Sequence, residues 1–166
     1  MGTVEQLRKV RDPAGDYLYP QAAIKGHQDA LVLFCAEFLG RQDAYHVAMA
    51  GLKGTGVDVD GDKLAQMAAI YPSHWAWHVG DVYTFVDDQL SAGQQWDIVS
   101  ADPYAGQFAP AADALPKFCA LARHVVILGT SMQARPSDIP RGWAETEMLF
   151  RSSYLGGTFW AVYRHA

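Results

Sequence analysis

Residues 30–129 alternate between short apolar runs of strand length and segments that have the period of a helix. The strand-like runs are 31–36, 55–58, 75–79, 96–101 and 125–128, and the helical segments between them are 41–52, 62–71, 82–90 and 115–122. Strands joined by helices cannot pair as hairpins, so they form right-handed crossovers within a parallel sheet that is covered on both faces.

The last 22 residues depart from this alternation and predict a β-hairpin. Residues 145–151 alternate between polar and apolar side chains, Gly156 and Gly157 supply a turn, and 158–163 is rich in strand-forming residues. The predicted fold class is therefore a three-layer, doubly wound α/β fold. Its seven-stranded sheet is mostly parallel and ends in a C-terminal antiparallel hairpin.

The N-terminal region differs from the rest of the chain. Residues 3–11 predict a short polar helix, which Asp12 and Pro13 end, and 12–28 is rich in Pro, Gly and Tyr without periodicity. We expect an N-terminal helix with a lid-like loop over residues 1–29, and a Rossmann-like domain over residues 30–166. A length of 166 residues, of which 50% are hydrophobic, fits a single domain overall.

The composition of the chain limits which kinds of binding partner and which cellular compartment are expected. A net charge of -5 disfavours a protein that tracks nucleic-acid duplexes, because such proteins need clustered Lys and Arg. Only Cys35 and Cys119 are present, which indicates a reducing, cytoplasmic compartment rather than a disulfide framework. No apolar run approaches the roughly 20 residues of a membrane span.

Three acids follow three consecutive predicted strands. Asp58 ends the second strand, Asp81 follows the third, and Asp102 follows the fourth. The carboxyl ends of parallel strands form the edge where open α/β sheets bind ligands, and an acid after the second strand is typical of ribose binding. Each acid also has a structural alternative: Asp58 and Asp81 are suitable helix caps, and Asp102 with Pro103 is an ordinary turn opener.

This pattern of units and acids resembles the class I S-adenosylmethionine-dependent methyltransferases over about residues 30–164. The resemblance implies that Asp58 binds the ribose hydroxyls of S-adenosylmethionine with Val59 beside it. It implies further that Asp81 binds the adenine amino group and that Val82 flanks the ring. Residues 97–104 are similar to the fourth motif of this family, which places Asp102 beside the methyl group and the acceptor.

The loop after the first strand departs from the family pattern, which is rich in glycine. Ala36 and Phe38 stand where the first two glycines are expected, and only Gly40 remains. We expect the ring of Phe38 to project into or beside the cofactor site unless the loop takes another path. Glu37 in the same loop is a candidate to bind the cationic amino group of the cofactor.

The acceptor of such a methyl transfer is unknown. Asp102, as orienting group or base, and Tyr104, as stacking wall or donor, are the candidate catalytic residues. Residues 101–104 resemble the Asp-Pro-Pro-Tyr motif of methyltransferases that act on base amino groups, with one proline missing. That leaves a nucleic-acid acceptor open although the acidic charge disfavours it. The acceptor site is expected from 104–108, the loop 130–142 and the segment around Tyr17 and Tyr19.

Two functional hypotheses result. The first is an S-adenosylmethionine-dependent methyltransferase of unknown acceptor, and the alternative is a catalytically degenerate relative that serves as a binding or scaffolding protein. No metal site is expected, because Lys63 replaces the required glycine of a calcium loop, and His74 and His78 fall on a predicted strand. The protein is expected to be a monomer or a homodimer, with no membrane partner.

Overall fold

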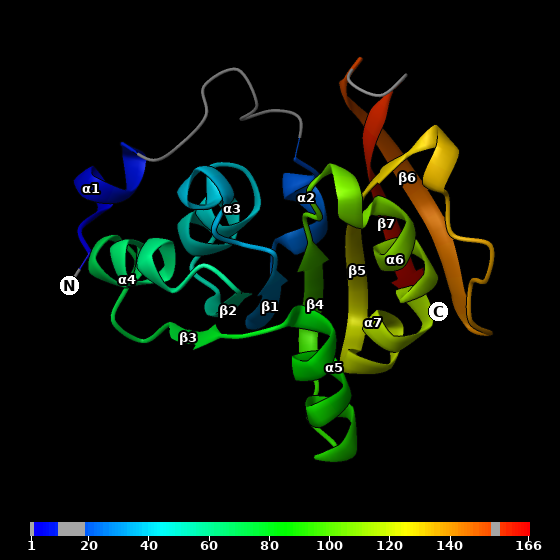
Figure 1. Cartoon of the computed structure of the whole chain (residues 1–166), viewed down its shortest axis with the longest axis horizontal. Helices are drawn as coiled ribbons and strands as arrows, with labels where there is room; N and C mark the ends of the chain where they lie inside the picture. The colour runs from blue at the N-terminus through cyan, green and yellow to red at the C-terminus, as the bar shows by residue number, and fades with distance from the viewer. Residues whose placement is uncertain (1, 10–18, 154–156) are drawn as a thin grey trace.

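The computed structural model describes residues 2–9, 19–153 and 157–166, and its centre is a seven-stranded sheet in the order β3-β2-β1-β4-β5-β7-β6 (Figure 1). The strands are β1 Asp29–Leu33, β2 Lys53–Asp58, β3 Ala76–Val79, β4 Trp96–Ala101, β5 Ala122–Ser131, β6 Trp143–Ser152 and β7 Thr158–His165. β1 to β5 pair in parallel, whereas β7 runs antiparallel to both β5 and β6. The predicted fold class is therefore confirmed.

Helices cover both faces of the sheet (Figure 1). One face packs against α1, α2, α3 and α4, and the other packs against α5, α6 and α7. The helices are α1 Val4–Arg8, α2 Gln21–Ile24, α3 Asp43–Met49, α4 Gly61–Ile70, α5 Val82–Ser91, α6 Phe108–Asp113 and α7 Leu115–Leu121, with the short 3-10 helices η1 Glu37–Gly40, η2 Ala105–Gln107 and η3 Met132–Ala134.

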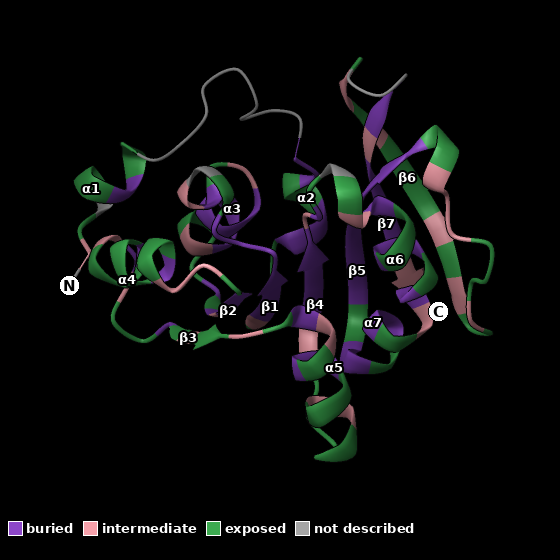
Figure 2. Cartoon of the chain, in the orientation of Figure 1, coloured by how far each residue is buried: buried purple, intermediate pink, exposed green. Residues whose placement is uncertain are grey.

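β1 is buried on both faces after Asp29, which explains its uninterrupted apolar sequence from Ala30 to Leu33 (Figure 2). In β1, Ala30 and Val32 contribute to the core on the α3 side, and Leu31 and Leu33 contribute to the core on the α7 side. Neighbouring side chains on a strand point to opposite faces, so a strand that is covered on both sides favours apolar residues at every position.

The first strand ends earlier than predicted. The apolar run 31–36 indicated a strand through Ala36, but β1 stops at Leu33 and Phe34 takes a left-handed backbone conformation with φ of 58°. The chain then turns into η1, so Ala36 precedes a 3-10 helix and does not belong to the strand. An apolar run alone cannot mark this turn, because the turning residues are themselves buried.

Two short helices lie where none was predicted, and one predicted helix is shorter. α2 lies within the predicted loop, and α6 tolerates Pro110 in its first turn because that position needs no hydrogen-bond donor. The segment 115–122 was predicted to be helical to its end, but Ala122 is the first residue of β5. The predicted loop over 130–142 begins with the last two residues of β5, Thr130 and Ser131, and contains η3 as its one helix.

The N-terminal segment is described in part. Thr3 and Gln6 form the capping box that begins α1. Residues 12–18 of the predicted lid-like loop, including Tyr17, lie outside the described residues, and the lid stays a prediction. Among the described residues, no helix is long and apolar enough to span a membrane.

Candidate functional site

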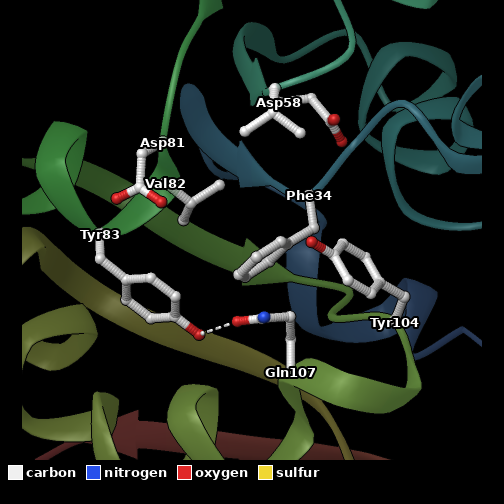
Figure 3. A pocket seen from close by; sticks show the side chains of 8 residues that line it. Phe34, Asp58, Asp81, Val82, Tyr83, Tyr104 and Gln107 are labelled. Carbon is white, nitrogen blue, oxygen red and sulfur yellow. Dashed lines mark hydrogen bonds between the residues drawn. The ribbon is translucent and has the colours of Figure 1, made fainter.

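A small pocket lies at the carboxyl edge of the sheet, between the ends of β1, β2 and β4 and the start of α5 (Figure 3). It encloses about 50 Å³. That is room for a few water molecules and less than a nucleoside needs. The residues that line it are Phe34, Asp58, Val59, Asp81, Val82, Tyr83, Tyr104 and Gln107.

Asp58 ends β2 and presents its carboxylate at this pocket, with only 8% of the residue exposed. Oδ2 accepts a hydrogen bond from the backbone N–H of Ala36 at 3.0 Å, and Oδ1 accepts one from Asp60 at 3.0 Å. The alternative role as a helix cap is wrong for Asp58, because Asp60 caps α4 by accepting from the N–H of Lys63. A carboxylate accepts about four hydrogen bonds, so Asp58 keeps capacity for ligand hydroxyls.

Asp81 caps a helix and also lies at the pocket, while its binding of an adenine amino group stays a prediction. It is the N-cap of α5, and its Oδ2 accepts from the backbone N–H of Thr84 at 2.8 Å and from the Thr84 hydroxyl at 3.0 Å. It also lines the pocket, next to the buried side chain of Val82 and the exposed side chain of Val59. The second and third strand ends therefore converge on one pocket, as the sequence predicted.

The ring of Phe34 lies among the side chains that line this pocket, between Tyr83 and Tyr104, which the sequence did not predict (Figure 3). Only 6% of the residue is exposed. The ring makes edge-to-face contacts with Tyr83 and Tyr104, at centroid distances of 5.9 and 6.1 Å. The apolar run 31–36 hid this residue, because a strand through Ala36 would make Phe34 an ordinary core side chain.

Among the described residues of the first loop, Ala36, Glu37 and Gly40 do not line the pocket. Ala36 contributes its N–H to Asp58. Gly40 has φ of 72°, and a Cβ there would lie 2.6 Å from that of Ala44, so this glycine serves the packing of α3. The side chain of Phe38 lies outside the described part of the structure, and the prediction that it enters the site stays a prediction.

Asp102 lies at the end of β4 but faces away from this pocket, toward β6. Its Oδ1 accepts a hydrogen bond from Nη1 of Arg151 at 2.8 Å, and both side chains are largely buried, at 19% and 16% exposure. The guanidinium of Arg151 lies 4.2 Å from the ring centre of Trp160. Gly129 leaves room for this ion pair, since a Cβ there would lie 2.9 Å from Nη1.

Buried polar groups surround the Asp102–Arg151 pair. Tyr19 is 1% exposed and its hydroxyl lies 2.9 Å from that of Ser100, so Tyr19 belongs to the core and does not form an acceptor-side wall. Asp43 is 2% exposed, and its Oδ2 has no hydrogen-bond partner among the described residues. Burial raises the pKa of Asp43 well above its usual range, and the nearby charge of Asp102 raises it further.

Glu37 and Tyr104 are the two remaining predicted residues of the site. Burial, and then the charge of Asp102, raises the pKa of Glu37, which is solvent-exposed in η1. Tyr104 is 48% exposed, lines the pocket and contacts Phe34. In the described ranges, no three His, Cys, Asp or Glu side chains are arranged to hold a metal ion.

Several solved structures resemble this chain, although no family model and no curated protein matches it. TrmN from Thermus thermophilus has a TM-score of 0.64 at 17% identity, over 88% of this chain and 48% of its own. The magnesium protoporphyrin IX methyltransferase ChlM from Synechocystis PCC 6803, with bound SAM, has a TM-score of 0.61 at 15% identity, over 98% of this chain and 81% of its own. Aeropyrum pernix fibrillarin, in complex with S-adenosyl-L-methionine, has a TM-score of 0.61 at 15% identity, over 86% of this chain and 68% of its own.

The chain spans about half the length of TrmN and of SMU.776, which was crystallised with SAH: the matched share is 48% of the first and 50% of the second. At these identities the likeness concerns architecture. The superposition with ChlM extends over 98% of this chain, whose sheet includes the antiparallel β7. The chain therefore has the fold of the class I S-adenosylmethionine-dependent methyltransferases.

Proposed function

We propose that this chain binds S-adenosylmethionine at the Asp58 pocket and transfers its methyl group to an acceptor not yet identified. The observation that carries the proposal is the position of Asp58. It is a largely buried carboxylate at the end of β2, held by two backbone N–H groups and turned to a pocket that Asp81 and Val82 also line. Hydroxyl donors of a ribose suit such a carboxylate.

The charge of the pocket favours a nucleoside over a nucleotide. Its acidic residues are Asp58 and Asp81, and no Lys or Arg is among the described residues that line it. A phosphate group would meet negative charge without a compensating cation, whereas S-adenosylmethionine carries no phosphate. This distinction separates the proposed cofactor from ATP and from the dinucleotides that other doubly wound α/β proteins bind.

The cofactor would bring an activated methyl group on a sulfonium, so the protein has mainly to orient the acceptor and exclude water. Tyr104 is exposed at the rim of the pocket and suits a stacking or hydrogen-bonding role toward the acceptor. Asp102 has a smaller part than its motif implies, because Arg151 already binds its Oδ1. The neighbours include a porphyrin methyltransferase and fibrillarin, so the fold does not specify the acceptor.

Isothermal titration with S-adenosylhomocysteine tests the binding step. We expect measurable binding to the wild type and a loss of roughly 1–3 kcal/mol for Asp58→Asn, the usual effect of altering a charged hydrogen-bond partner. Asp87→Asn is the matched control, because Asp87 is exposed and pairs with Lys117 on α7, away from the pocket. ATP should give no heat. Folded wild-type protein that gives no heat with millimolar S-adenosylhomocysteine would refute the proposal.

The ring of Phe34 supports a second candidate, a methyltransferase-like protein that binds a partner without methyl transfer. In the described arrangement this ring takes space that an adenosine needs, and the Tyr83 hydroxyl donates to Oε1 of Gln107 at 3.1 Å across the same region. Incubation of a cell extract with labelled S-adenosylmethionine separates the candidates. Methylation of any fraction that disappears with Asp58→Ala would exclude this second function.

A further inference from the structure

The carboxamide of Gln107 is a polar group of the Asp58 pocket that the sequence did not point to. Gln107 is the last residue of η2, and its half-buried side chain points toward Tyr83 and the ring of Phe34 (Figure 3). Its Oε1 accepts a hydrogen bond from the Tyr83 hydroxyl at 3.1 Å. Among the described residues, its Nε2 has no hydrogen-bond partner. A polar group of this kind in a pocket is available to orient a ligand.

Tyr83 determines which end of this carboxamide is offered to the pocket. Burial, and then the charge of Asp81, raises the pKa of Tyr83 to about 12, so its hydroxyl keeps its proton at neutral pH. That proton is donated to Oε1 of Gln107. A carbonyl oxygen accepts two hydrogen bonds and an amide nitrogen donates two, so Oε1 keeps one lone pair and Nε2 keeps its donors. Gln107 therefore offers an acceptor and a donor side by side.

Asp81 adds a second acceptor to the same pocket, from the start of α5. Its Oδ2 accepts from the backbone N–H and the hydroxyl of Thr84, whereas no described residue donates to its Oδ1. An ionised carboxylate is an acceptor only, so the ligand group that faces Asp81 has to be a donor. The pocket thus presents two acceptors and one donor to a base.

We propose that Gln107 recognises the adenine of the ligand through N7 and the N6 amino group, as a specificity-determining residue. The proposal rests on the proposed function, because it requires the adenosine of S-adenosylmethionine in this pocket. Nε2 donates to N7, Oε1 accepts one hydrogen of the N6 amino group, and Asp81 accepts the other. Glutamine forms this two-bond pair with adenine in nucleic-acid recognition as well. An adenine that takes the place of the Phe34 ring also meets Tyr83 and Tyr104, whose rings now contact Phe34.

Other purines fit this arrangement less well. Guanine and hypoxanthine carry an oxygen acceptor at position 6, which would face the carboxylate of Asp81 and Oε1 of Gln107. Turning the carboxamide over would bring Nε2 to this oxygen but would place Oε1 against N7, which is also an acceptor. The carboxylate of Asp81 cannot donate in either case. Opposed acceptors leave polar groups unpaired, which is costly in a partly buried pocket.

Isothermal titration with a ligand that lacks N7 tests the contact. S-tubercidinylhomocysteine is the 7-deaza analogue of S-adenosylhomocysteine and keeps the N6 amino group. We expect the wild type to bind it about tenfold more weakly than S-adenosylhomocysteine, and Gln107→Leu to bind the two ligands equally. Gln66→Leu is the matched control, because Gln66 is exposed on α4 and does not line the pocket, and it should keep the wild-type preference. Equal affinities in the wild type, or a preference that survives in Gln107→Leu, overturn the proposal.

Tyr83→Phe tests the orientation of the carboxamide separately from its presence. The variant keeps the aromatic ring beside Phe34 and loses only the hydroxyl, so the preference for S-adenosylhomocysteine over its 7-deaza analogue should fall below that of the wild type. An unchanged preference overturns the role of Tyr83 in the recognition. Folded wild-type protein that gives no heat with either ligand overturns the proposed function and this inference with it, whereas equal binding of both ligands overturns the Gln107 contact alone.

Discussion

Aspartates in two regions of the sheet's carboxyl edge have different kinds of hydrogen-bond partner. At the β2 and α5 end, Asp58 and Asp81 accept hydrogen bonds from neutral donors and face a pocket. At the β4 end, Asp102 is bound to Arg151, and buried polar groups surround the pair. A carboxylate that neutral donors hold keeps its negative potential for a ligand, whereas one paired with arginine has its charge already compensated.

The pocket acids are therefore expected to serve ligand binding, and Asp102 is expected to serve the stability of the sheet. Arg151 belongs to the outermost strand, and its bond to Asp102 passes over Gly129 of β5 and beside Trp160 of β7. The pair therefore ties β6 to the centre of the sheet, while the other acids remain available at the pocket. We expect substitutions at the pocket to change ligand affinity and substitutions around Asp102 to change the free energy of unfolding.

Phe34→Gly has the largest expected effect and tests whether the ring of Phe34 competes with a ligand for the pocket. Removing a buried phenylalanine side chain costs about 3–5 kcal/mol, and relief of the left-handed backbone offsets about 1 kcal/mol, so the net loss of stability is about 2–4 kcal/mol. The affinity for S-adenosylhomocysteine should rise about tenfold or more, because the ring no longer occupies the pocket. Urea denaturation and isothermal titration measure the two effects.

Phe34→Leu is the control for this substitution, since leucine keeps much of the buried volume and does not relieve the backbone. It should bind S-adenosylhomocysteine as weakly as the wild type does. If Phe34→Gly leaves the affinity unchanged, the ring does not compete with the nucleoside, and the second candidate function loses the observation that supports it.

Arg151→Ala tests whether the Asp102–Arg151 pair stabilises the folded protein. Loss of the guanidinium leaves Asp102 without its partner and Trp160 without its cation, so we expect a loss of about 1–3 kcal/mol in the free energy of unfolding. Arg164→Ala is the control on the adjacent strand, because its pair with Glu147 is exposed at 38% and 42% and should contribute less than about 1 kcal/mol. Equal losses for both variants in urea denaturation would contradict the distinction.

The architecture could be predicted from sequence wherever the signal is local. β4 has the predicted bounds, because its run ends at Asp102 and Pro103, where the polarity changes. β1 was predicted too long, because the residues that turn after Leu33 are as apolar as those in the strand. Periodicity reports burial, and a buried turn has the same composition as a buried strand.

The candidate site was predictable in part for the same reason. Asp58 and Asp81 were found because the ends of their strands are visible in the sequence, and the structure brings them to one pocket. Arg151 was missed because it lies 49 residues from Asp102 and reaches it across two strands. No local pattern encodes such a contact, which depends on the order of strands in the sheet.

Asp43→Asn gives the smallest expected effect and tests the buried groups around Asp102 through pH. The pKa of Asp43 is raised by burial, and then by Asp102, whereas in the unfolded chain an aspartate titrates near its ordinary value. Between these two values the unfolded state releases the proton and the folded state retains it, so stability falls as pH rises through that window.

An asparagine side chain cannot ionise, so the Asp43→Asn variant should have a flatter pH dependence of stability and should gain up to about 1 kcal/mol at neutral pH. Urea denaturation from pH 4 to 8 measures both slopes, and Asp87→Asn, at an exposed ion pair, should keep the wild-type slope. Identical slopes for Asp43→Asn and the wild type would mean that Asp43 is ionised in the folded protein, and that the β4 end holds more charge than Arg151 compensates.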